Sequence, residues 1–270
     1  LPYRRAKINH IVFGLRREFD MTELRSVSIT NEIGLISEEV PTSKLNWTLD
    51  SDADVGFMFQ LKQPVYARNN DTLIGAYYID NFTRSAATVY TIECIDAFGV
   101  LNESMFAGGI YNNKSAKTIL SEIVGTDFEI VYDNVEDIEL SGIIESGTKR
   151  DAIQQVLFAW GVCASTDGRQ NIRIFSLDIT PKEFTEDDIF SGVTMDVSSL
   201  VTQVSVTAHT YTEDESGNVE VNGKKYKDVT EVYTVMNPNI TASDKQNAVE
   251  VTDATLVSPS IGQAVAQRVY

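Results

Sequence analysis

The stretches GAYYID at residues 75–80 and YTIECIDAFGVL at residues 90–101 carry the pattern that decides the fold. Their apolar residues recur at every second position, as in Tyr90, Ile92 and Cys94. A repeat of two is typical of a β-strand that buries one of its faces. Both stretches are therefore predicted to be strands with one apolar and one polar face.

The same alternation extends towards the N-terminus, through LRSVSI at residues 24–29 and LNWTLD at residues 45–50. Polar turn sequences separate the runs, at residues 31–34, 50–56 and 69–71. Short strands at this spacing indicate a small antiparallel barrel or sandwich. We assign a first β-barrel domain to residues 1–110.

The periodicity changes to that of a helix at Ser115. Ile119, Leu120 and Ile123 fall on one helical face, with Ser115 as a candidate N-cap and Gly125 as the stop. An amphipathic helix is therefore predicted between Ser115 and Gly125.

A second helix is predicted from a cap at Thr148 to a stop at Gly161, with an apolar stripe between them. Residues 162–166 then have strand character, and Asp167-Gly168 is a hairpin turn sequence that precedes a return strand around Ile172. Residues 111–180 are predicted to form a separate α/β insert domain.

Strand patterns return after about residue 192. Apolar and Thr-rich runs lie at residues 201–212 and 229–235, with turns expected at residues 213–218 and 222–223. We assign residues 181–255 to a second β-barrel domain. The predicted fold class is α+β, mainly β, with two small antiparallel β-barrel domains flanking the α/β unit.

The last residues, 256–270, are predicted to begin a C-terminal helix. Ile261, Val265 and Val269 recur at helical spacing up to Tyr270, and no stop sequence follows. We expect the chain to be cut inside or just after this helix.

The composition excludes several classes of protein. The 270 residues are 43% hydrophobic, which is typical of a folded globular protein. The only two cysteines, Cys94 and Cys163, cannot build a disulfide scaffold and are predicted to be buried free thiols. The only two histidines, His10 and His209, lack metal-ligand spacing, which disfavours zinc and His-triad chemistry. No stretch approaches the roughly 20 apolar residues that cross a bilayer.

The chain is strongly acidic, with a formal net charge of -17. Residues 1–125 carry 12 basic and 15 acidic side chains, whereas residues 126–270 carry 10 and 24. Such a surface repels nucleic-acid phosphates and anionic lipids. Specific nucleic-acid binding is therefore not expected.

Two segments resemble ligand-binding motifs but lack residues that those motifs require. Residues 50–54 begin like a calcium loop, but the required glycine comes one place late, at Gly56, and Leu61 occupies the bidentate Glu position. Residues 142–149 have the spacing of a phosphate-binding loop, but the last two residues are transposed and Glu145 would repel phosphate. Thr148 is better explained as a helix cap. We predict no catalytic, cofactor-binding or metal-binding residue, and no enzymatic activity.

The order of segments resembles that of phage tail proteins of the baseplate-hub family. The resemblance rests on residues 24–29, 45–50, 75–80 and 90–101, followed by the Ser-Ala-Lys-x-Ile-Leu helix that begins at Ser115. It extends over most of the chain, including the order of barrel, α/β insert and second barrel. The residues that carry it are packing and turn residues.

The resemblance implies a structural protein of a phage or prophage virion. Hubs of this family form homotrimers in which two barrels per chain make a pseudo-sixfold ring. That ring joins the tail tube, or a distal tail protein, to a central spike or fibre. The implied location is the baseplate of the virion tail, assembled in the bacterial cytoplasm, with DNA passing through an acidic lumen. No cofactor and no membrane segment are implied.

A carbohydrate-binding or cell-wall glycan-hydrolysing module is the alternative. Glycoside hydrolysis needs two carboxylates held about 5–10 Å apart across a cleft. The chain has 39 acidic residues, so neighbouring pairs occur by chance and the sequence does not place two across a cleft. A cleft with facing carboxylates and an exposed aromatic platform would favour the alternative.

Overall fold

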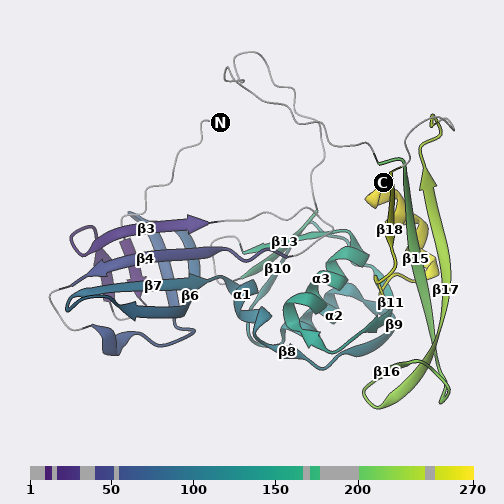
Figure 1. Ribbon diagram of the computed structural model, residues 1–270, viewed down its shortest axis with the longest axis horizontal. Helices are drawn as coiled ribbons and strands as arrows, with labels where there is room; N and C mark the ends of the chain where they lie inside the picture. The colour runs from purple at the N-terminus through teal and green to yellow at the C-terminus, as the bar shows by residue number, and fades with distance from the viewer. Residues whose placement is uncertain are drawn as a thin grey trace.

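The computed structural model describes residues 10–13, 17–30, 40–51, 55–166, 171–176, 201–240 and 247–270. Figure 1 shows three groups of elements along the long axis of the molecule. A first sheet lies at one end, helices and short strands lie in the middle, and a second sheet lies at the other end with its long strands running across that axis.

The first sheet has seven strands in the order β2-β1-β5-β6-β7-β4-β3, and every neighbouring pair is antiparallel. The strands are β1 (His10–Phe13), β2 (Arg17–Asp20), β3 (Leu24–Thr30), β4 (Lys44–Asp50), β5 (Pro64–Asn69), β6 (Thr72–Arg84) and β7 (Val89–Ile95). The register pairs Trp47 with Ile92 and Leu49 with Tyr90, so the apolar positions of the two runs share one buried face. The alternation in the sequence therefore predicts this face correctly.

Phe59 lies at the centre of the core of this sheet, just after the 3-10 helix η1 (Gly56–Met58). Its ring centroid is 6.0 Å from that of Trp47, 5.8 Å from that of Tyr90 and 5.7 Å from that of Phe82. Phe19 on β2 adds a fourth ring at 6.5 Å. Rings at these separations gain both burial and edge-to-face attraction.

The middle group contains three helices and seven short strands. These are α1 (Ala97–Asn102), β8 (Met105–Phe106), β9 (Gly109–Ser115), α2 (Ala116–Val124), β10 (Ile130–Asp133), β11 (Glu139–Ile144), β12 (Gly147–Thr148), α3 (Lys149–Trp160), β13 (Cys163–Thr166) and β14 (Ile172–Phe175). The strands form a three-stranded sheet β10-β14-β13 and the pairs β11-β9 and β12-β8.

Both predicted helices of this group are confirmed, together with their caps. The Ser115 hydroxyl accepts a hydrogen bond from the Thr118 N–H at 3.2 Å, and the Thr148 hydroxyl accepts one from the Asp151 N–H at 3.1 Å. Gly161 ends α3 in the left-handed conformation, with φ 83°. The Asp167-Gly168 turn lies outside the described residues, but the flanking strands β13 and β14 are antiparallel.

The helix α1 differs from the strand pattern that the sequence suggests up to Leu101. It has six residues, and Ala97, Phe98, Gly99 and Leu101 are all buried. Because the segment is short and most of its residues are buried, its sequence shows no helical periodicity. The Asp96 side chain determines the outcome, because it accepts a hydrogen bond from the Gly99 N–H at 3.0 Å and caps the helix.

The second sheet has four strands in the order β16-β17-β15-β18. They are β15 (Gln203–Glu213), β16 (Val219–Val221), β17 (Lys224–Met236) and β18 (Ala248–Val251), and the helix α4 (Pro259–Val269) follows. The predicted turn at residues 222–223 joins β16 to β17, with φ 53° at Asn222 and 76° at Gly223. Pairing of β18 with β15 is parallel, which the sequence does not predict.

The predicted α+β, mainly β fold is confirmed, and its β parts are sheets that curl like half-barrels (Figure 1). One face of β15 and β17 packs against α4, where the ring of Tyr233 leaves no room for a β-carbon at Gly262. This face belongs to the same apolar cluster as α2 and α3, whereas the first sheet has a cluster of its own. The domain boundaries after residues 110, 180 and 255 remain predictions.

Among the described residues, no helix combines the length and apolar character needed to cross a membrane.

We predict that Phe59→Ala destabilises the first sheet by about 3–5 kcal/mol, because it empties the centre of a cluster of aromatic rings. Chemical denaturation followed by tryptophan fluorescence measures the change, since Trp47 belongs to the cluster. The control is Leu61→Ala, two positions away, whose side chain is 62% exposed. Equal effects of the two changes would contradict the central place of Phe59.

Candidate functional site

The connection between the first sheet and the middle group is built around a buried carboxylate. Asp96 is 1% exposed and lies between β7 and α1. One carboxylate oxygen accepts from the Gly99 N–H at 3.0 Å, and the other accepts from the Ser43 N–H at 2.9 Å and the Thr166 hydroxyl at 3.4 Å. Asp96 therefore links the residue before β4, the start of α1 and the end of β13.

Burial raises the pKa of the Asp96 carboxyl above its usual value. The hydrogen bonds from the backbone of Ser43 and Gly99 act in the opposite direction, because they favour the charged form, but they do not cancel the effect of burial. The carboxylate is thus held at this position despite a cost in desolvation.

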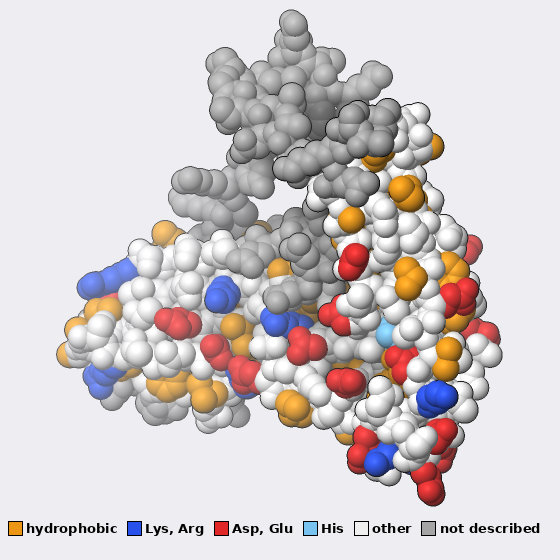
Figure 2. Space-filling view, turned by 45° about the vertical axis from the view of Figure 1, so that its right-hand side comes forward, with side chains coloured by type: hydrophobic (Ala, Val, Ile, Leu, Met, Phe, Trp, Pro, Cys, Tyr) orange, Lys and Arg blue, Asp and Glu red, His pale blue; other side chains and the backbone are white. Residues whose placement is uncertain are grey.

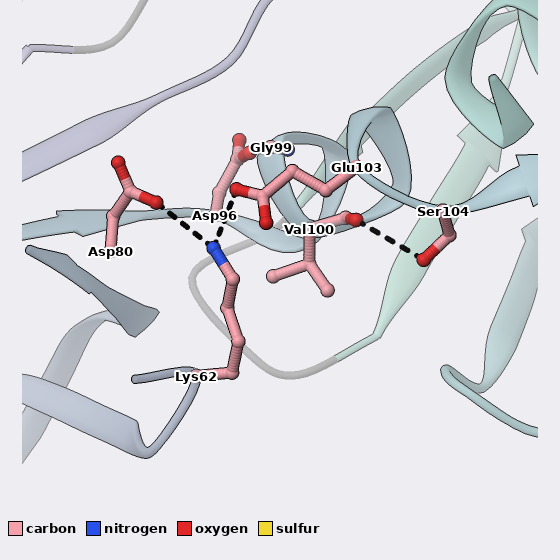
Figure 3. A network of polar contacts seen from close by, with 7 residues as sticks. All are labelled: Lys62, Asp80, Asp96, Gly99, Val100, Glu103 and Ser104. Carbon is pink, nitrogen blue, oxygen red and sulfur yellow. Dashed lines mark hydrogen bonds and ion pairs between the residues drawn. The ribbon is translucent and has the colours of Figure 1, made fainter. Parts of the chain in front are cut away.

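A second polar contact spans the same connection. The ammonium group of Lys62 lies 2.9 Å from Asp80 on β6 and 2.6 Å from Glu103 at the end of α1 (Figure 3). Burial works against the charge of Lys62, but its hydrogen bonds with Glu103 and Asp80 outweigh burial and raise the pKa of the ammonium group. The first sheet and α1 are thereby joined on the surface as well as in the interior.

His209 forms a comparable link in the second sheet. Its Nδ1 lies 2.8 Å from the carboxylate of Asp228 on β17, and its Nε2 lies 3.1 Å from the carbonyl oxygen of Thr252. The imidazole also stacks on Tyr211, with ring centroids 5.8 Å apart. His209 therefore ties β15 both to β17 and to the segment that leads into α4.

A cavity of 540 Å³ lies next to this histidine, between β9 and β15. Its walls include Tyr111, Ser141, His209, Tyr211, Ser258 and Ser260. Both ring nitrogens of His209 already have partners, and the hydroxyls of Ser258 and Ser260 bond to each other at 2.8 Å. Among the described residues that line the cavity, Glu213 is the one carboxylate, so the cavity does not offer the facing pair that glycoside hydrolysis requires.

The residues of the phosphate-loop-like segment have structural roles. Thr148 caps α3, as predicted, and Lys149 bonds to Asp127 at 2.7 Å and to the carbonyl oxygen of Val124 at 3.2 Å. Of the calcium-loop-like segment, residues 52–54 lie outside the described residues, and Asp50 forms an ion pair with Arg25. The described part of the chain holds no group of three or more His, Cys, Asp and Glu side chains that could bind a metal.

The two cysteines are free in the structure, as the sequence predicts. Cys94 is buried in the first sheet, and burial raises the pKa of its thiol to about 12. Cys163 is partly buried, and burial raises the pKa of its thiol as well. Raised thiol pKa values are the opposite of what a nucleophilic cysteine needs.

The outer edges and faces of the two sheets offer surfaces for contact with other molecules. The edge strand β3 presents exposed Ser26, Ser28 and Thr30. On the second sheet, β17 exposes Val232 and Met236, which are 61% and 58% accessible. Figure 2 shows orange side chains among white ones over the upper part of this sheet, and charged side chains gathered at its lower tip.

Sequence reasoning missed Asp96 and the pair His209–Asp228. Asp96 directly precedes the apolar run 97–101, and an Asp at that place is the signal from which an N-cap could have been predicted. No pattern in the sequence connects His209 with Asp228, because a cross-strand pair depends on the register of a hairpin.

Comparison of the fold with solved structures identifies phage tail proteins. Prophage tail protein gp18 of Listeria monocytogenes EGD-e superposes with a TM-score of 0.61 at 15% identity, covering 97% of this chain and 76% of that one. The tail protein of Neisseria meningitidis MC58 superposes with a TM-score of 0.60 at 9% identity, and the match covers 97% of this chain and 74% of that one. The 43 kDa tail protein of prophage MuSo2 from Shewanella oneidensis superposes with a TM-score of 0.53 at 11% identity, and the match covers 97% of this chain and 77% of that one.

No protein-family model and no curated protein sequence matches this chain. The resemblance to phage tail proteins is thus confirmed at the level of the fold. It extends over nearly the whole chain and about three-quarters of each solved structure.

We predict that Asp96→Ala destabilises the protein by about 2–4 kcal/mol, because α1 loses its cap and the Ser43 and Gly99 N–H groups lose their acceptor. The raised pKa makes the folded state bind the Asp96 proton more tightly than the unfolded chain does. Stabilisation by Asp96 is then complete below the ordinary pKa of 3.8 and decreases as pH rises through the raised value.

Chemical denaturation of the wild type and of Asp96→Ala, from below pH 3.8 to neutral pH, measures the difference between their free energies of unfolding. The contributions of the other titrating groups largely cancel in this difference. Asp71→Ala, at an exposed aspartate in the β5–β6 turn, is the matched control. A difference that grows with rising pH would contradict this account of Asp96.

Proposed function

We propose that this chain is a structural protein of a phage or prophage tail, a baseplate hub that forms a trimeric, pseudo-sixfold ring. The observation that carries the proposal is the fold shared with three solved tail proteins over 97% of the chain. The ring would join the tail tube, or a distal tail protein, to a central spike or fibre. The protein would act at the tip of the tail and have no catalytic role.

The arrangement of two sheets in one chain supports this ring. Each chain has one curled sheet at either end, so three chains would supply six such sheets around an axis. Six curled sheets would match a sixfold tube on one side, and the three chains would match a threefold spike on the other.

The charge of the chain is compatible with a passage for DNA. Three chains would carry 3 × -17 = -51 formal charges. An acidic wall repels the phosphates of DNA and would keep it from binding during transit.

The polar contacts around Asp96 and Lys62 also suit a ring. A ring closes only if each subunit holds its two ends at a constant angle, and the buried carboxylate and the Lys62 bridges fix the first sheet against α1. A free hinge at this point would allow open chains of subunits as well as closed rings.

The proposal predicts that the protein is part of purified tail particles and lies at one end of the tail. Gold-labelled antibodies against the chain should mark that end in electron micrographs of virions released by cells that carry its gene. Label along the whole tail would indicate a tube protein, and particles free of the protein would refute the proposed function.

A further inference from the structure

We propose that the free edge of β17 in one copy pairs with the free edge of β3 in the next copy, so that one β-sheet continues across the two chains. This inference rests on the proposed ring and names the strands that would build it. Both edges lie on described residues, at opposite ends of the molecule (Figure 1).

The edge of β17 is long and only partly covered. β16 pairs with residues 224–226 alone. From Lys227 to Met236, no described strand pairs with β17 on the side away from β15. Val229, Val232 and Met236 in this segment are 56%, 61% and 58% exposed. A long edge with exposed apolar side chains is a template for another strand.

The edge of β3 has the same character. β3 is the terminal strand of the seven-stranded sheet and pairs with β4 on its one covered side. Its seven residues, Leu24–Thr30, contain one charged side chain, Arg25. Ser and Thr side chains occupy most of its exposed positions, and these do not oppose the approach of another strand.

Other outer strands of the two large sheets and of the β11-β9 pair have features that oppose pairing. β2 has four residues, three of them charged, and β18 has four residues with Glu250 among them. β9 is longer, but Asn113 adopts φ 47° and its register with β11 shifts at this point. Short, charged or irregular edges are the usual means by which proteins prevent unwanted pairing. β3 has a register shift with β4 near its start, between Leu24 and Ser26, but from Ser26 to Thr30 it is regular and uncharged, and residues 229–236 of β17 form a long edge with one charged side chain.

Charge favours the pairing of these two edges with each other. Chains with a net charge of -17 repel one another, so a contact between copies must avoid acidic surface. Residues 229–236 carry one charged side chain, Glu231, and β3 carries one, Arg25, whose charge is already matched by its ion pair with Asp50, so neither edge presents an acidic surface of any size. Joining two different edges is a head-to-tail contact, which generates a ring when the rotation closes.

Lysine substitutions test the two edges separately. Val229→Lys/Val232→Lys places lysine on both faces of the β17 edge, and Ser26→Lys/Ser28→Lys places it on β3; all four positions are exposed. Each double variant should stay folded and lose self-association in native mass spectrometry and light scattering. Thr126→Lys/Ser146→Lys adds the same charge at exposed positions outside both edges and should assemble like the wild type.

Mixing the two edge variants gives the decisive result. The variant blocked on β17 keeps an intact β3, and the variant blocked on β3 keeps an intact β17. An equimolar mixture should therefore form a 1:1 heterodimer and nothing larger. If the β3 variant still self-associates alone, β17 pairs with another β17 and the inference is wrong.

A wild-type chain that stays monomeric up to its solubility limit, at salt concentrations that screen its charge, would also overturn the inference. The same holds if the wild type associates and both edge variants associate equally well. Neither result bears on whether the protein is found in tail particles, which the antibody labelling decides on its own.

Discussion

The attachment of the first sheet to the rest of the molecule centres on one buried carboxylate, that of Asp96. It lies where the first sheet ends and α1 begins, and it accepts hydrogen bonds from three segments that are far apart in the sequence. Burying it is costly, as its raised pKa shows. Its hydrogen bonds fix the direction of α1, and the ion pairs of Lys62 with Asp80 and Glu103 add a second link on the surface. Without these contacts, the first sheet would be held to the middle group mainly by apolar packing, as between the rings of Tyr78 and Phe128.

The parts of the fold that follow from local physics could be predicted from the sequence. Alternation at residues 90–95 specifies the strand β7 and its buried face, and the caps Ser115 and Thr148 specify where α2 and α3 begin. The parts that were missed depend on contacts between distant segments. α1 is too short to show a helical period in the sequence. The parallel pairing of β18 with β15 joins segments about 45 residues apart, and no local sequence pattern predicts which strands pair over such a separation.

The same distinction applies to the candidate site. The function of the proposed hub would reside in its sheet edges and in the angle between its two ends, and neither corresponds to a motif in the sequence. Composition shows that a surface is acidic but does not show which strand ends a sheet. The edges of β3 and β17 are apparent only once the strand order is known, and the pair His209–Asp228 only once the register is known.

The central claim is that two curled sheets per chain are set at a fixed angle in order to build a ring. Electron cryomicroscopy of the tail tip tests it most directly. The account predicts three copies of the chain around a channel, six curled sheets in a closed ring, and continuous β-structure from β17 of one copy to β3 of the next. A single copy on the axis, or copies that meet through the middle group with both sheets turned outward, would contradict it.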